Sequence, residues 1–159
     1  MTRPTEADLY AWNDPDDLLR ALGQLSADQK DELADAVVSL VGHSDPDVRE
    51  EAVRTLFVSW KDQQARDLAV NAIRSDDAPE VRSTAAYAIA ATSTAATRLA
   101  DIRVLLDVLT DEREQLAVRA AAYDALLILH RRPDFPSKRQ EFDPHRDVDW
   151  AWLRGLPSE

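Results

Sequence analysis

Histidine is the side chain best suited to hold a metal ion or move a proton near neutral pH. The chain has three, His43, His130 and His145, and none has a second histidine three or four residues away. Two histidines at that spacing would share one face of a helix, which is how a single helix holds a metal ion. We therefore predict capping or surface histidines, with no metal site and no cofactor.

A pair of adjacent acidic residues could act in general acid–base catalysis. Three such pairs fall at or near the starts of predicted helices: Asp16/Asp17, Glu50/Glu51 and Asp76/Asp77. Free backbone amides in the first helical turn favour negative charge, so helix capping explains these pairs without a reaction. The chain has no cysteine, which excludes a thiol nucleophile, and only three glycines, which excludes a glycine-rich phosphate loop. It also has no Gly-x-Ser-x-Gly segment, the turn that carries the nucleophile of many serine hydrolases. We expect no catalytic residues and no enzyme.

The charge balance narrows the class of partner. Thirty Asp and Glu residues outnumber nineteen Lys and Arg residues, which gives a formal net charge of −11 and a pI near 4.7. Nucleic acids and anionic membranes both bind positive surfaces, so neither is expected as a partner. The first residues carry acids where a secretory signal needs a basic and then an apolar stretch, which favours a cytoplasmic protein.

The elements that position these residues are all predicted to be helices. Apolar residues recur with a period near 3.6, and Ala, Leu, Arg and Glu are abundant. Three segments place an N-capping aspartate before a proline suited to the first helical turn: Asp14-Pro15, Asp45-Pro46 and Asp143-Pro144. The predicted helices cover residues 5–12, 15–24, 27–42, 46–60, 62–74, 79–92, 97–109, 113–131 and 144–154.

A repeated pattern organises the middle of the chain, in three copies 33 and 37 residues apart. Four positions match at helical spacing: Val48, Val81 and Val118; Arg49, Arg82 and Arg119; Ala52, Ala85 and Ala122; Leu56, Ile89 and Leu126. The apolar members form a stripe that another helix must cover, and the small alanine allows that helix to approach closely. Each copy therefore predicts a pair of antiparallel helices that is fully covered only when the next pair stacks on it.

The turn before each copy resembles that of the HEAT-repeat family, in particular the short bacterial repeats of the phycobiliprotein-lyase type. The matching residues are Asp76 with Pro79-Glu80-Val81-Arg82 and Ala85, and Pro46-Asp47-Val48-Arg49 with Ala52. His43 stands where the family has an aspartate, and the third copy lacks the turn proline. The resemblance implies an α-solenoid of stacked antiparallel helix pairs with a right-handed superhelix. It places repeats at about 27–60, 62–92 and 97–131, between an N-terminal helical cap (1–26) and a connector with a C-terminal capping helix (132–159).

The resemblance also bears on the three repeated arginines, Arg49, Arg82 and Arg119. Each follows a core valine at the start of a helix, so we predict hydrogen bonds between repeats rather than a basic binding stripe. DNA glycosylases built on similar repeats need a basic concave face, which this acidic chain does not offer. Iron hydroxylases built on them use His-Glu pairs, whereas the histidines here precede serine or arginine.

In stacked helix pairs the second helices line the concave surface. The repeat alignment puts eight candidate partner-binding residues on or near that face: Glu51, Arg54, Val58, Trp60, Thr84, Tyr87, Asp124 and Ile128. Tyr87 is the aromatic residue most expected to be exposed. For Trp60 the alternative is packing against the following helix.

The acidic excess is concentrated before residue 43, where nine acidic residues accompany three basic ones. Opposite potentials speed the encounter of two proteins, so this region favours a basic partner. We hypothesise a monomeric, non-catalytic protein-binding module that uses the concave face and the acidic N-terminal region, for example an immunity- or antitoxin-like inhibitor of a basic toxin. The alternative is a lyase-like or small-ligand-handling enzyme that uses the groove of the solenoid.

Overall fold

The computed structural model describes residues 4–12, 14–25, 29–63, 66–132 and 141–156, and every regular element in these ranges is a helix. In chain order they are α1 (Glu6–Ala11), α2 (Pro15–Leu22), α3 (Lys30–Leu40), α4 (Pro46–Val53), η2 (Arg54–Ser59), α5 (Arg66–Ser75), α6 (Pro79–Thr92), α7 (Arg98–Thr110), α8 (Leu116–Leu129), α9 (Pro144–Asp147) and α10 (Trp150–Leu153). Most of the predicted connector, residues 133–140, lies outside the described ranges.

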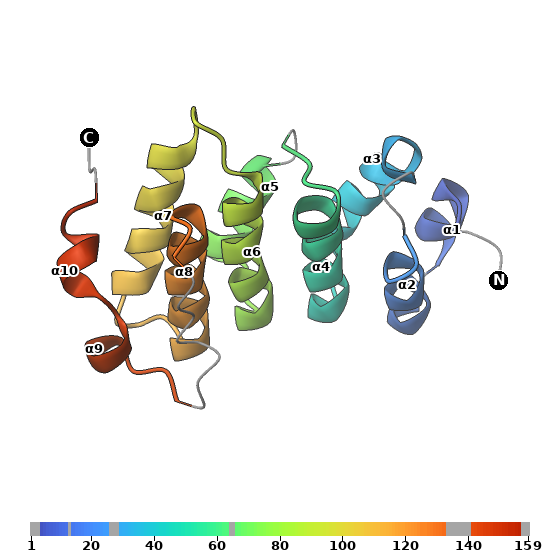
Figure 1. Cartoon of the computed structure of the whole chain (residues 1–159). Helices are drawn as coiled ribbons and strands as arrows, with labels where there is room; N and C mark the ends of the chain where they lie inside the picture. Colours follow the sequence, from blue (N-terminus) through green and yellow to red (C-terminus); the bar gives the residue numbers. More distant parts are fainter. Residues whose placement is uncertain (1–3, 13, 26–28, 64–65, 133–140, 157–159) are drawn as a thin grey trace.

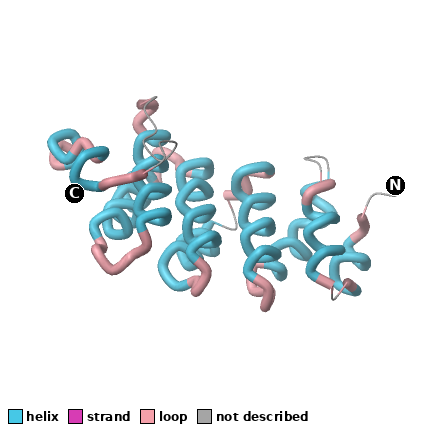
Figure 2. Tube along the Cα trace, turned by 90° about the horizontal axis from the view of Figure 1, so that it is seen from below, coloured by secondary structure: helices cyan, strands magenta, loops and turns pink. Residues whose placement is uncertain are grey.

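The helices pack in two rows that run the length of the molecule, with the two chain ends at opposite ends of the rows (Figure 1 and Figure 2). One row contains the second helix of each pair: α2 contacts α4, α4 and η2 contact α6, and α6 contacts α8. In the other row α1 contacts α3, and α5 contacts α7. Contacts of α3 with α4, α5 with α6 and α7 with α8 join the rows. The predicted all-α solenoid is confirmed.

The Asp-Pro segments start helices as predicted. The side chains of Asp14, Asp45 and Asp143 each accept a hydrogen bond of 2.9 Å from the backbone N–H two residues later. Each following proline occupies the first helical turn, where its missing N–H costs nothing. These caps fix where α2, α4 and α9 begin.

The repeated apolar positions form the core. The valine, alanine and leucine or isoleucine of all three copies have no exposed surface: Val48, Val81, Val118, Ala52, Ala85, Ala122, Leu56, Ile89 and Leu126. They lie on the second helices, which contact one another as well as the first helices of their own pairs. The alanines therefore allow neighbouring second helices to pack closely along the whole row.

Two predicted helices differ in the structure. The predicted helix 46–60 changes after α4 into the π-helix η2, where the Trp60 N–H bonds to the Thr55 carbonyl five residues back at 2.9 Å. The predicted helix 144–154 is split into α9 and α10, because Val148 is extended and the Asp149 side chain begins a new helix by accepting from the Trp152 N–H at 2.9 Å. In both places a local hydrogen bond overrides the apolar period.

The C-terminal helices cover the end of the last repeat. The Tyr123 hydroxyl of α8 accepts a hydrogen bond of 3.0 Å from the Asp149 N–H, and its ring lies 6.4 Å from that of Trp152. Trp150 donates its indole N–H to the Pro144 carbonyl at 2.8 Å. Both tryptophans of α10 therefore pack against the protein and hold α9 and α10 onto α8.

We predict that Ala85→Leu lowers the free energy of unfolding by about 1–3 kcal/mol, because extra methylenes in a packed core force neighbours out of position. Ala117→Leu is the matched control, since Ala117 is exposed near the start of α8. Chemical denaturation of the two variants measures the difference. Equal stability of the two variants would contradict close packing at the repeated alanine.

Candidate functional site

The exposed face of the second helices carries part of the predicted partner surface. The Arg54 side chain is 48% exposed, and Val58 and Ile128 are each 40% exposed. Val58 and Ile128 occupy equivalent positions in the first and third copies, ten residues after the core valine. These three residues offer two aliphatic contacts and a cation to another molecule.

Two of the predicted surface residues are buried. Trp60 is 7% exposed and belongs to the hydrophobic core, since it lies four residues after the buried Leu56 and continues the same stripe. Asp124 is 2% exposed. Tyr87, predicted to be the most exposed aromatic, is half-buried against the core, and its hydroxyl donates to Asp124 Oδ2 at 3.1 Å. Burial of the first two removes them from the accessible surface.

Of the remaining predicted residues, Thr84 links two neighbouring second helices, whereas Glu51 pairs within its own copy. Thr84 of α6 donates from its hydroxyl to Glu50 of α4 at 3.0 Å, and Glu50 also pairs with Arg54. Arg54 lies 3.5 Å from the carboxylate of Glu51. Burial raises the pKa of Glu51, and the nearby Glu50 raises it further, against the opposing effect of Arg54. Together with the Tyr87–Asp124 bond, these contacts fix the second helices as one surface.

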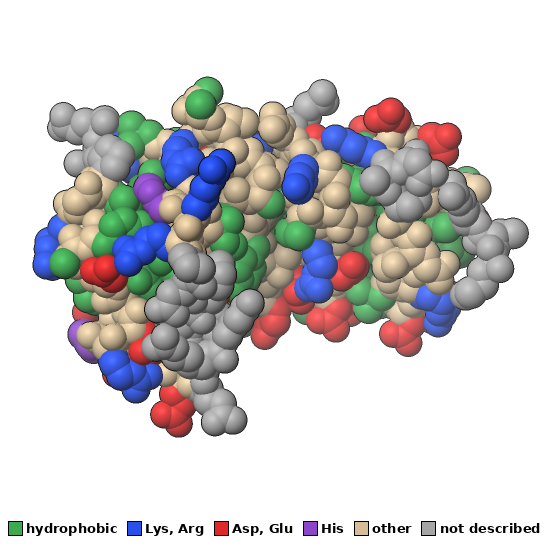
Figure 3. Space-filling view, viewed as in Figure 1, with side chains coloured by type: hydrophobic (Ala, Val, Ile, Leu, Met, Phe, Trp, Pro, Cys, Tyr) green, Lys and Arg blue, Asp and Glu red, His purple; other side chains and the backbone are tan. Residues whose placement is uncertain are grey.

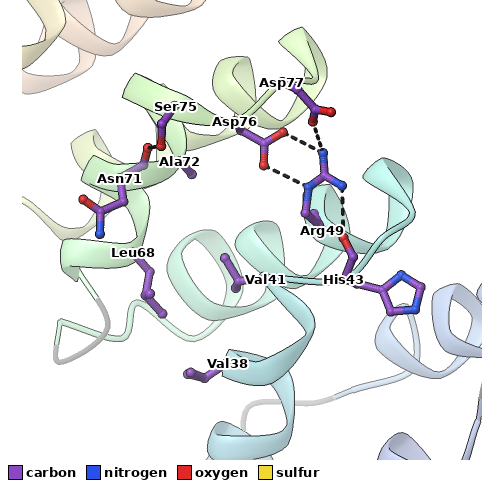
Figure 4. Close-up of a pocket in the computed structure, with 11 residues that line it drawn as sticks. Val38, Val41, His43, Arg49, Leu68, Asn71, Ala72, Ser75, Asp76 and Asp77 are labelled. Atoms are coloured by element: carbon purple, nitrogen blue, oxygen red, sulfur yellow. Dashed lines mark hydrogen bonds and ion pairs between the residues drawn. The ribbon is translucent and has the colours of Figure 1, made fainter.

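Arg49, the first of the repeated arginines, joins two successive turns (Figure 4). Arg49 donates from Nη1 to the carbonyls of His43 and Ser44 in its own turn, at 3.0 and 3.1 Å. Its Nε and Nη2 donate to the two carboxylate oxygens of Asp76 in the next turn, at 2.9 and 2.8 Å, and Nη2 also pairs with Asp77. One guanidinium therefore holds two turns together.

Arg82 repeats this arrangement one unit later. Its Nη1 donates to the carbonyls of Asp76 and Asp77 at 2.7 and 3.1 Å, and its Nε and Nη2 donate to Glu114 at 2.9 and 2.8 Å. Arg119 differs, because its Nε donates to the Leu109 carbonyl at 2.9 Å. We call the contacts of Arg49 and Arg82 with Asp76, Asp77 and Glu114 the arginine ladder. The predicted inter-repeat role is observed for Arg49 and Arg82.

The carboxylates of the ladder are held in their charged form. Partial burial by itself would raise the pKa of Asp76, but hydrogen bonds from Arg49 and from the Ala78 N–H outweigh burial and hold the pKa below its ordinary value. At Glu114 burial is likewise outweighed by the hydrogen bonds from Arg82 and from the Gln115 N–H, so its pKa is also lowered. The ladder consequently consists of ion pairs at neutral pH.

Comparison with known proteins identifies the architecture. Residues 12–90 and 34–127 match the family model described as HEAT repeats, and together these matches span more than half of the chain. The chain belongs to the HEAT-repeat family. HEAT repeats generally mediate contacts between proteins. No curated protein and no solved structure matches the chain.

Two HEAT-repeat turns use a side chain other than the family aspartate. His43 takes the place of the family aspartate, and its Nδ1 accepts from the Asp45 N–H at 3.1 Å just as Asp76 Oδ1 accepts from the Ala78 N–H at 2.9 Å. Asp76 lies six residues before Arg82, and Glu114 supplies the carboxylate of the third turn although it lies five residues before Arg119. The sequence signal that could have identified Glu114 is an acidic residue five or six positions before the repeated arginine.

A groove of about 520 Å³ lies between α3 and α5, beside the Arg49 end of the arginine ladder. Its apolar side chains include Val38, Val41 and Leu68, and its polar end is formed by Arg49 with Asp76 and Asp77 (Figure 4). Among the described residues, no group of three or more His, Asp or Glu side chains is placed to hold a metal ion. Within the same ranges no helix is long and apolar enough to span a membrane.

We predict that Arg82→Ala lowers the free energy of unfolding by about 2 kcal/mol, because it leaves the partly buried Glu114 without its charge-assisted hydrogen bonds. Arg113→Ala is the matched control, since the Arg113 side chain is 91% exposed and pairs only with the neighbouring Asp111 among the described residues. Urea denaturation compares the two. A loss of stability that is the same in both variants would argue against the ladder.

The ladder also predicts a direction of pH dependence. Because the pKa values of Asp76 and Glu114 are lowered on folding, the folded state binds fewer protons, and stability present above their ordinary pKa values of 3.8 and 4.5 is lost as the pH falls below them. In the double variant Arg49→Gln/Arg82→Gln the loss should be shallower. Unfolding measured between neutral and acidic pH tests this, and parallel curves for parent and variant would contradict it.

Proposed function

We propose that this HEAT-repeat protein is a non-catalytic module that binds another protein on the exposed face of α4, η2, α6 and α8. The observation that carries the proposal is the exposure of Val58 and Ile128. They are two of the four large apolar residues that are exposed in the described part of the chain, and they sit at equivalent positions of two repeats. Exposed aliphatic residues in register along a fixed surface are suited to contact a second protein.

The contacts between helices support this role. Glu50–Thr84 and Tyr87–Asp124 connect α4 to α6 and α6 to α8 by side-chain hydrogen bonds. A surface that is already ordered loses less conformational entropy when it binds, and therefore keeps more of its contact energy. The polar residues in this face thus serve to hold Val58 and Ile128 in fixed relative positions.

The N-terminal helices supply the charge for an encounter. Exposed acidic residues lie on α1, α2 and α3: Glu6, Asp16, Asp31, Glu32 and Asp35. Opposite charge raises the rate at which two proteins meet, so these acids favour a basic partner. An immunity- or antitoxin-like inhibitor of a basic toxin is one form that such a module takes.

The enzyme alternative would place a small ligand in the groove between α3 and α5. At its polar end, Asp76 already accepts two hydrogen bonds from Arg49, which commits that carboxylate to the arginine ladder. The remaining lining combines aliphatic side chains such as Val38 and Leu68 with the polar side chains of His43, Asn71 and Ser75. His43 accepts from the Asp45 N–H and Ser75 donates to the Asn71 carbonyl, so these polar groups are engaged within their own segments. The binding module is therefore the better supported function.

Capture from the native lysate, with the partner identified by mass spectrometry and then purified, tests the proposal. The double variant Val58→Asp/Ile128→Asp should weaken binding of that partner more than about tenfold, because it places charges in an apolar contact. Leu116→Asp is the control, since Leu116 is 53% exposed at the start of α8. Unchanged binding by the double variant, measured by calorimetry, would refute the assigned face.

The acidic region has a separate readout. Replacing Asp31 and Asp35 with asparagine should slow association with the same partner and reduce the effect of added salt on the association rate, since steering by exposed charges is screened by ions. Dissociation should change little. An association rate that is insensitive both to salt and to these substitutions would exclude a steering role for α3.

A further inference from the structure

The end of α8 has an arginine where glycine is the usual residue. The Arg132 N–H bonds to the Leu127 carbonyl at 2.9 Å, and the Arg131 N–H bonds to the Ile128 carbonyl at 3.0 Å. This pair of bonds is the Schellman motif, in which the residue after the helix cap adopts a left-handed conformation. Arg131 has a φ of 55°, a conformation that glycine adopts without steric cost and other residues do not.

No contact inside the described structure accounts for the Arg131 side chain. It is exposed, and within the described ranges its guanidinium makes no hydrogen bond or ion pair. A cation near a helix C-terminus gains some stability from the helix dipole, but Arg132 beside it already supplies one. An exposed residue in an unfavourable backbone conformation, whose charged group has no partner within the described ranges, points to use by another molecule.

Two further arginines lie at this end of α8. Arg98, at the start of α7, donates to the Leu129 carbonyl at the end of α8. The guanidinium of Arg132 lies 4.5 Å above the Trp152 ring and 3.2 Å from the carboxylate of Asp149. Basic side chains gather around a histidine at this end of the molecule, on the left of Figure 3, whereas acidic ones are prominent at the α1–α3 end.

His130 lies among these arginines and does not add to their charge. Its ring meets the Trp152 ring edge-on, with centroids 5.3 Å apart, and its Nε2 is buried without a hydrogen-bond partner in the described structure. Burial lowers the pKa of His130, and the charges of Arg98 and Arg132 lower it further. The positive charge of this group at neutral pH therefore comes from the arginines.

We propose that Arg98, Arg131 and Arg132, here called the arginine corner, bind an acidic peptide segment of a partner protein. Guanidinium groups match carboxylates in geometry and charge and can bind them through two parallel hydrogen bonds. A peptide with a few carboxylates fits three arginines, whereas a long polyanion would meet the repulsion of a chain with a net charge of −11. This site is additional to the proposed second-helix surface and opposite to it in charge preference.

The test uses a fluorescein-labelled triglutamate peptide and the full chain, with binding followed by fluorescence anisotropy at low salt. Arg131→Gly should weaken binding about tenfold through the loss of one charge-assisted contact. The same variant should melt at or above the temperature of the parent, because glycine fits the left-handed position. Arg113→Ala removes an equal charge at an exposed position and should bind the peptide as the parent does.

Two additional measurements sharpen the assignment. Bound peptide should raise the pKa of His130, observed by NMR titration, and leave those of His43 and His145 unchanged. Val58→Asp should leave peptide binding intact, so failure of the arginine corner and failure of the second-helix surface can be told apart. If Arg131→Gly does not fold, Arg131→Asn repeats the comparison with a residue that tolerates the left-handed conformation.

Three results would overturn the proposal. The first is the absence of peptide binding by the parent chain. The second is an equal loss of binding in Arg131→Gly and Arg113→Ala, which would show a general charge effect. The third is tighter binding of single-stranded DNA of equal charge with the same dependence on Arg131, which would assign the corner to nucleic acid.

Discussion

One guanidinium in each of two successive units connects this solenoid along its length. Arg49 and Arg82 each bind two carbonyls of the turn that precedes their own helix and both carboxylate oxygens of the turn that follows. Apolar burial alone would press the helices together without defining how one pair is set against the next. The planar, five-donor geometry of arginine supplies that definition, which lysine could not. The second-helix surface depends on this register.

The sequence carried enough information to predict the repeat architecture, because its signals are local and periodic. Val48, Ala52 and Leu56 recur at the spacing of one helix face, and all their equivalents are buried. The Asp-Pro caps are equally local, since Asp45 bonds to an N–H two residues away. Such signals lie within a single helix or its first turn and require no knowledge of the partner helix.

The candidate surface was harder to predict, because its residues interact with neighbours distant in sequence. Asp124 is buried and accepts from Tyr87, 37 positions earlier, and no helical period reveals that contact. The π-helical turn of η2 has no marker in the sequence comparable to proline. The left-handed conformation of Arg131 could not be predicted either, because glycine is the residue that normally marks such a position after a helix. The Tyr87–Asp124 bond depends on tertiary contact, whereas η2 and Arg131 depend on local hydrogen bonds that the residue types do not announce.

The arginine ladder makes the junctions between repeats interchangeable. Arg49 donates from Nε and Nη2 to the two carboxylate oxygens of Asp76, and Arg82 donates from the same two nitrogens to those of Glu114 at the same distances. The glutamate side chain is one methylene longer than the aspartate side chain. An array shortened by one unit, with the Glu114 turn following the Arg49 helix, would still pair a donor with a matching acceptor. Arrays of different length can thus arise by duplication or loss of whole units, since the chemistry of each joint is complete in itself.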